Sequence, residues 1–99
     1  MGKVTFVDET TSGDRRAVLG LDVAEERLAL RELIRRRVYE EAGDGQEAGR
    51  AYEHALAAFG RNGFLVLVGD RQIAELDQEV ELADAAEVAF LRLVPLAGG

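Results

Sequence analysis

The last two residues, Gly98 and Gly99, are the part of this sequence that could take part in chemistry. Glycine has no Cβ, so two successive glycines form a thin and flexible segment that can enter a narrow tunnel in another protein. The group delivered there is the α-carboxylate of Gly99. With ATP, a carboxylate can become an acyl-adenylate, and then a thioester, a thiocarboxylate or an amide. We therefore expect this end to be the working part of the chain.

The residues before the two glycines must position them. The stretch 87–94 alternates as a hydrophobic strand, with Val88 and Phe90 on one face. Pro95 fixes its own backbone angle and cannot donate to a sheet, so the strand is expected to stop near Val94. The sequence thus predicts a folded domain over 1–94 and a flexible tail over 95–99. Candidate residues for recognition of the tail by a partner are Arg92, Leu93, Pro95, Leu96 and Ala97.

Composition bounds the class of protein. Ninety-nine residues make one domain with a modest core. The net charge of -7 argues against duplex nucleic acid or an anionic membrane as the main partner. The absence of cysteine excludes disulfides, thiolate metal sites and a cysteine nucleophile. No segment is apolar enough to span a bilayer, and a cytoplasmic location is the default expectation.

The first part of the chain is predicted to form a hairpin followed by two helices. Residues 3–7 and 16–22 indicate antiparallel strands joined by the polar stretch 8–14. A first helix is expected over 28–42, or from about Ala24 with Asp22 as its cap. The stripe that indicates it consists of Leu30, Leu33, Ile34 and Val38.

The second helix is expected over about 45–59, after a break at 43–45. The basic run 35–37, in the later half of the first helix, is most simply a solvated helix face, with a docking patch for an acidic partner as the alternative. The lone His54 has polar neighbours and no paired carboxylate or cysteine, which favours a surface residue over a ligand or base.

The C-terminal half indicates strands over 64–68, 72–74 and 77–82 and a last strand over 87–94. With Val88 and Phe90 facing the first helix, Ala89, Leu91 and Leu93 lie on the open face of the sheet. This apolar row is either covered by the second helix or is a patch for a partner. The order of elements predicts an α+β fold, with a mixed four- to five-stranded sheet packed on one main helix and an inserted second helix.

Several segments of this chain resemble the β-grasp sulfur-carrier proteins of the MoaD/ThiS type, which are related to ubiquitin. The run 64–73 (FLVLVGDRQI), the segment 87–90 (EVAF) and the terminal Gly98-Gly99 are similar to the C-terminal half of that family. The run 30–34 (LRELI) resembles the start of its helix, and the end from Arg92 onwards is similar to the tail of ubiquitin. The chain departs from the family at 84–87 (DAAE), where members often have Asp-Gly-Asp, and in its additional helix.

The resemblance implies a substrate rather than an enzyme. An ATP-dependent activating enzyme would adenylate the Gly99 carboxylate, and the acyl group would pass to sulfur, for sulfur transfer or for conjugation to a lysine. The ATP would belong to that enzyme, with no cofactor and no metal held by this chain. Other partners would be a sulfur donor, a conjugating enzyme or the large subunit of a synthase. Two alternatives stay open: the small subunit of a molybdopterin-synthase-like complex, and a ubiquitin-like interaction module without chemistry.

Overall fold

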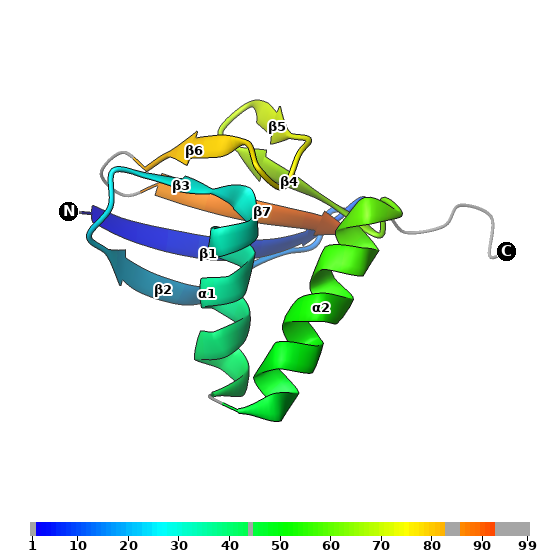
Figure 1. The fold of residues 1–99 in the computed structure, drawn as a ribbon. Helices are drawn as coiled ribbons and strands as arrows, with labels where there is room; N and C mark the ends of the chain where they lie inside the picture. The colour runs from blue at the N-terminus through cyan, green and yellow to red at the C-terminus, as the bar shows by residue number, and fades with distance from the viewer. Residues whose placement is uncertain (1, 44, 83–85, 93–99) are drawn as a thin grey trace, which may run out of the picture.

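The computed structural model describes residues 2–43, 45–82 and 86–92. It confirms the α+β class, with two helices and a mixed sheet (Figure 1). The elements in chain order are β1 (Gly2–Thr10), β2 (Arg15–Val23), β3 (Arg27–Ala29), α1 (Leu30–Ala42), α2 (Gln46–Gly60), β4 (Phe64–Val68), β5 (Arg71–Ile73), β6 (Glu79–Glu81) and β7 (Ala86–Arg92).

The main sheet has five strands in the order β2-β1-β7-β4-β5. Strands β1 and β7 are parallel, and the other neighbours are antiparallel. The parallel register runs from Val4 opposite Ala86 to Thr10 opposite Arg92. The first and last strands of the described residues therefore lie side by side at the centre of the sheet, and β7 is hydrogen-bonded on both edges.

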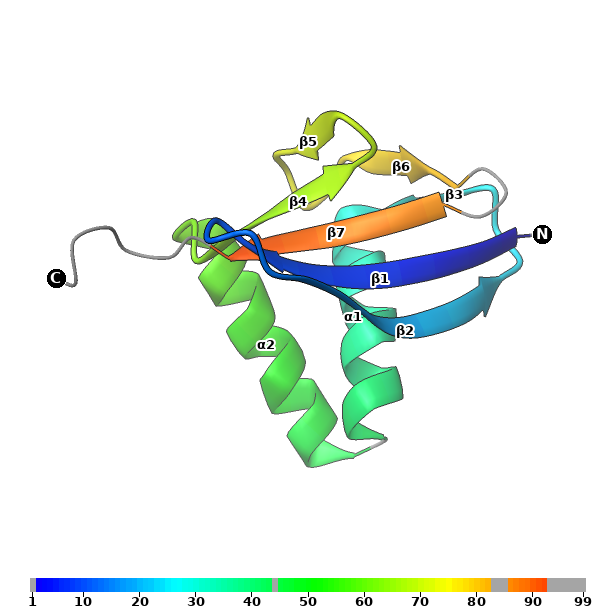
Figure 2. The ribbon, with the colours of Figure 1, turned by 180° about the vertical axis from the view of Figure 1, so that it is seen from behind.

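Both helices pack on the same face of this sheet, which Figures 1 and 2 show from opposite sides. The stripe of α1 buries Leu30, Leu33 and Ile34 against the sheet. Tyr52 and Phe59 of α2 pack against the same core. The second helix therefore does not cover the opposite face, which resolves one alternative left open by the sequence. Neither helix of the described residues is long and apolar enough to cross a membrane.

The core lies between the helices and the sheet. Its fully buried side chains include Phe6 of β1, Val66 of β4 and Val88 of β7, together with Leu33 of α1. Each of the central strands thus contributes to one hydrophobic cluster. Burying a side chain of this size contributes about 1.5–3 kcal/mol, so these residues supply much of the stability that holds β7 in the sheet.

Helix α1 begins at Leu30, later than either start that the sequence favoured. Residues 27–29 form strand β3 instead, and they pair antiparallel with β6 in a separate two-stranded sheet. The residue before the helix, Ala29, makes no capping hydrogen bond through its side chain. The first amides are satisfied by distant backbone: Leu30 N–H donates to the Gln78 carbonyl at 3.0 Å, and Arg31 N–H to the Leu76 carbonyl at 2.9 Å.

Strand β1 is longer than predicted and reaches Thr10, within the stretch that its polarity indicated as a turn. Ladder partners on both sides, β2 and β7, override that local preference. The turn is then short: Gly13 N–H donates to the Thr10 carbonyl at 3.0 Å, and its φ of +101° suits glycine. The extension places Asp8 inside the sheet, at the site described next.

Candidate functional site

The site is the carboxyl end of β7, from which the chain continues toward the two glycines. Arg92 is the last residue of this strand, and its side chain is exposed. The other residues that the sequence singled out in this part of the chain lie outside the described residues: Leu93, Pro95, Leu96, Ala97, Gly98 and Gly99.

The backbone at this end is held by both neighbouring strands. Arg92 lies opposite Thr10 of β1 on one side and opposite Phe64 of β4 on the other. The N–H of Thr11, in the first turn, donates to the Arg92 carbonyl at 3.2 Å. The carboxyl end of β7 is therefore paired with a neighbouring strand on both edges.

Phe90 connects this end of β7 to the rest of the core. Its ring centre lies 6.0 Å from that of Phe6 on β1, edge to face, and 5.5 Å from that of Phe64 on β4. Phe64 is in turn 5.8 Å from Phe59 of α2. Aromatic pairs at these separations contribute about 0.5–1.5 kcal/mol beyond their burial. The row fixes β7 relative to both of its neighbours and to the second helix.

Arg37 of α1 lies over this end of the sheet and contacts both β1 and β7. Only 13% of its side chain is exposed. Its two terminal nitrogens donate to both carboxylate oxygens of Asp8, at 2.8 and 3.0 Å, and its Nε donates to Glu41 at 3.3 Å. The guanidinium carbon lies 4.6 Å from the centre of the Phe90 ring. A paired fork of this kind is stronger than a single hydrogen bond, and stacking on the ring adds to it.

The environment keeps Arg37 charged. Burial acts to lower the pKa of its guanidinium, because water no longer solvates the cation. The hydrogen bond to Asp8 and the negative charge of Glu41 act in the opposite sense, and the net effect is a raised pKa. Arg37 therefore brings a positive charge to the contact between α1 and β1.

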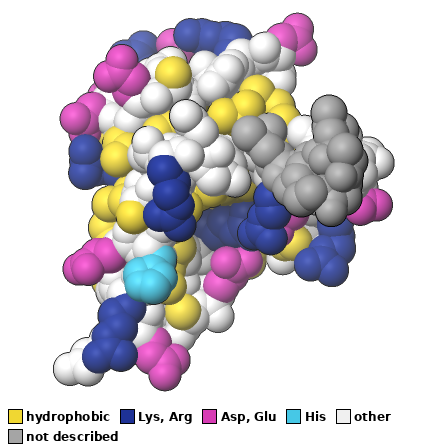
Figure 3. Space-filling model, turned by 90° about the vertical axis from the view of Figure 1, so that its right-hand side faces the viewer, with side chains coloured by type: hydrophobic (Ala, Val, Ile, Leu, Met, Phe, Trp, Pro, Cys, Tyr) yellow, Lys and Arg dark blue, Asp and Glu magenta, His cyan; other side chains and the backbone are white. Residues whose placement is uncertain are grey.

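A hollow of about 290 Å³ opens beside Arg37, between the two helices, the carboxyl ends of β1 and β7 and the first residue of β4. Figure 3 shows this face of the molecule, with basic and acidic side chains gathered around the recess. Its apolar lining is Ile34, Val38, Ala55, Phe64 and Phe90, and its charged lining is Asp8, Glu9, Arg37, Glu41 and Arg92. Within the described ranges, no group of three or more His, Cys, Asp and Glu side chains is placed to hold a metal ion.

The open face of the sheet carries the other two predicted residues. Ala89 is 7% exposed, and Leu91 is half-buried. Opposite them on β4 lie Leu67 and Leu65, both also half-buried. These two leucines were not predicted for the open face; the alternation within 64–68 was the available signal, and the antiparallel register with β7 places them there. The patch of four residues, hereafter the outer patch, has no helix of the described chain over it.

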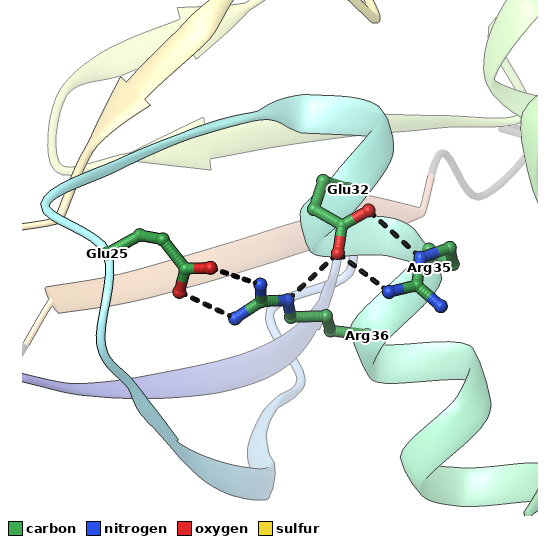
Figure 4. Close-up of polar contacts among 4 residues, drawn as sticks. All are labelled: Glu25, Glu32, Arg35 and Arg36. Atoms are coloured by element: carbon green, nitrogen blue, oxygen red, sulfur yellow. Dashed lines mark hydrogen bonds and ion pairs between the residues drawn. The ribbon is translucent and has the colours of Figure 1, made fainter.

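The remaining arginines of the basic run on α1 form ion pairs at another surface (Figure 4). Glu32 accepts hydrogen bonds from Arg35 at 2.9 and 2.8 Å and from Arg36 at 2.9 Å. Arg36 also binds Glu25 through two hydrogen bonds, of 2.9 and 2.6 Å. The two hydrogen bonds from Arg35, followed by the one from Arg36, lower the pKa of Glu32 to about 2, although partial burial acts to raise it. These arginines are therefore engaged within the molecule, and a solvated face describes them better than it describes Arg37.

Comparison of the chain with protein-family models, with curated proteins and with solved structures gave no match.

Proposed function

We propose that this protein is a ubiquitin-like carrier or modifier whose C-terminal glycine carboxylate is activated by a partner enzyme. The observation that carries the proposal is the course of the chain: β7 is a central strand, held on both edges, and the sequence beyond it ends in Gly98-Gly99. The carboxyl end of β7 is thus held by its neighbours, as a carrier with an activated terminal carboxylate would require.

The fold supports this proposal at the level of architecture. A mixed sheet with its first and last strands parallel at the centre, and with helices on one face, is compatible with a β-grasp. In that interpretation α1 is the main helix, and α2 is an insertion between it and β4. The resemblance of 64–73 and 87–90 to sulfur-carrier proteins points the same way.

The chemistry proposed for the terminus proceeds in two steps. An oxygen of the Gly99 carboxylate attacks the α-phosphorus of ATP, which forms an acyl-adenylate and releases pyrophosphate. A sulfur nucleophile of a partner then attacks the acyl carbon and displaces AMP. The partner enzyme supplies ATP binding and the nucleophile, since the sequence contains no cysteine. The acyl group would continue to a sulfur-transfer reaction or to a lysine of another protein.

The outer patch supports a docking role on the same molecule. It is an apolar surface on β4 and β7, made of Leu65, Leu67, Ala89 and Leu91. Strand β7 is also the strand that leads to the terminus. A partner that covers this surface is positioned to receive the terminal segment. The patch equally favours a second candidate, in which the protein is the small subunit of a synthase or a binding module without terminal chemistry.

The test is the intact mass of the protein purified from its own cells, combined with a search of the same lysate for lysines carrying a Gly-Gly remnant. Replacement of one terminal oxygen by sulfur would support sulfur carriage, and remnants on other proteins would support a modifier. A chain that continues beyond Gly99, or an unmodified terminus with a lysate free of remnants, would contradict the proposal. A stable stoichiometric complex with a larger subunit would favour the synthase alternative.

A variant that lacks Gly99 separates chemistry from folding. It is expected to unfold at the same urea concentration as the wild type, because no described core residue is changed, while every terminal adduct disappears. As a matched control, Gly60→Ala alters a glycine with open space around it at the end of α2 and leaves the terminus unchanged.

A further inference from the structure

Arg37 joins α1 to both strands of the parallel pair at one rung. Its guanidinium donates two hydrogen bonds to Asp8 of β1 and lies over the ring of Phe90 of β7. Asp8 and Phe90 are direct partners in the register of the two strands. The side chain of Arg37 therefore contacts both residues of this pair, Asp8 and Phe90, and links them to α1.

This rung lies next to the end of the parallel ladder. Two residues further along, Thr10 faces Arg92, which is the last described pair. Parallel ladders are slightly less stable per residue than antiparallel ones, and the ends of strands open first. With 13% of its side chain exposed, Arg37 is shielded from the solvent that weakens surface ion pairs. Arg37 is therefore suited to keep the carboxyl end of β7 paired with β1.

We propose that Arg37 is a positioning residue for the activation of Gly99, a role that rests on the function proposed above. In this role Arg37 acts through β7: it holds the part of this strand near its carboxyl end to α1 and to β1. A shift of the carboxyl end of β7 moves the starting point of the residues that lead to Gly99, and with it the region of the partner that the carboxylate can reach. A misplacement of about 1 Å can lower a reaction rate by about a hundredfold.

Steady-state kinetics distinguish this role from a general contribution to folding. The protein is the varied substrate of the activating enzyme, so a variant that is partly unfolded has a lower active concentration. Such a loss raises the apparent KM and leaves the maximal rate unchanged. A folded variant that docks normally but presents its carboxylate poorly has an unchanged KM and a lower maximal rate.

The experiment measures pyrophosphate exchange into ATP, driven by a desalted extract of the source cells whose own copy of the gene has been deleted. Arg37→Ala is expected to lower the maximal rate at least tenfold, with a KM within about twofold of the wild type. Arg37→Lys is expected to recover part of the rate, because its ammonium retains the charge opposite Asp8 but lacks the planar fork. Arg36→Ala is the matched control, since it breaks ion pairs of the same helix with Glu25 and Glu32.

Two results would overturn the proposal: an equal fall of the maximal rate in Arg37→Ala and Arg36→Ala, or a change confined to KM in Arg37→Ala. Wild-type protein that drives no exchange would overturn the proposed function, and the role of Arg37 with it. Circular dichroism at the assay temperature verifies folding. If Arg37→Ala is unfolded, Asp8→Asn is measured in its place. This substitution removes the charge pair and keeps Arg37 over Phe90. An unchanged maximal rate in Asp8→Asn would also overturn the proposal.

Discussion

Arg15 and Glu87 form an ion pair across the outer face of the sheet, although strand β1 lies between their strands. In the register, Arg15 lies opposite Glu9, which is two residues beyond Val7 on β1. Glu87 is two residues before Ala89 on β7. The arginine side chain therefore runs diagonally past the rung that joins Val7 to Ala89. We infer that its methylene groups contribute to the burial of Val7, which is fully buried on a face without a helix from the described residues.

Removal of this covering side chain should expose apolar surface at little cost in stability. The side chains of Arg15 and Glu87 are 51% and 53% exposed, and pairs of this kind contribute about 0–1 kcal/mol. Arg15→Ala is expected to lower the free energy of unfolding by less than about 1 kcal/mol in urea titrations and to increase the binding of a hydrophobic dye. The control is Arg27→Ala, which removes an exposed pair with Glu81. Equal dye binding by the two variants would contradict the covering role.

The ion pairs of Glu32 should make stability depend on pH in the acid range. In the folded protein its pKa is about 2, below its ordinary value of 4.5, because Arg35 and Arg36 favour the charged form. A lowered pKa stabilises the fold above about pH 4.5, and this contribution is lost as the pH falls toward 2. Glu32→Gln is expected to lower the free energy of unfolding by about 1–2 kcal/mol at pH 7.

The same measurement at low pH tests the cause. Since Glu32 is protonated in both folded and unfolded protein below about pH 2, wild type and Glu32→Gln should converge there in urea titrations. A constant difference between the two proteins from pH 7 to pH 2 would show that the substitution acts through packing and not through charge. Glu41→Gln serves as a control for the charge change, since it alters a different carboxylate of α1.

The sequence predicted the elements with strong local patterns. The helices expected over 28–42 and about 45–59 are observed at Leu30–Ala42 and Gln46–Gly60, because apolar residues at helical spacing must face a common core. The strands of the hairpin and 64–68 were also identified. Strand β3 was missed, since its three residues carry no pattern of their own and are extended only because β6 pairs with them.

The contacts of Arg37 were missed for a different reason. The three consecutive arginines of α1 were interpreted as one solvated surface, but successive helical residues point about 100° apart. Arg37 lies three residues after the buried Ile34, on the face that α1 turns to the sheet. That spacing was the available signal. Asp8, whose carboxylate accepts the hydrogen bonds of Arg37, lay in a stretch predicted as a turn. The ion pair therefore could not be predicted without the register of β1 and β7.

Loss of the Asp8 carboxylate should destabilise the fold more than loss of an exposed partner. Arg37 is mostly buried, so Asp8→Asn leaves a guanidinium with less compensation for its lost hydration. We expect the free energy of unfolding to fall by about 1–3 kcal/mol, measured in urea at pH 7. Asp77→Asn is the matched control, because it weakens a pair with Arg31 that is exposed on both sides. Equal losses in the two variants would contradict a special role for burial at Arg37.

The outer patch should control the affinity of the partner rather than the rate of activation. Leu91 is half-buried on the face opposite the helices, where a polar substitution removes apolar contact area for a partner but little of the core. In the pyrophosphate-exchange assay, Leu91→Ser is expected to raise KM about tenfold, equivalent to about 1.4 kcal/mol, and to leave the maximal rate unchanged. Leu28→Ser, a change of another half-buried leucine on β3, is the control for lost stability. If Leu91→Ser left KM at the wild-type value, or if both variants raised it equally, docking through this surface would be contradicted.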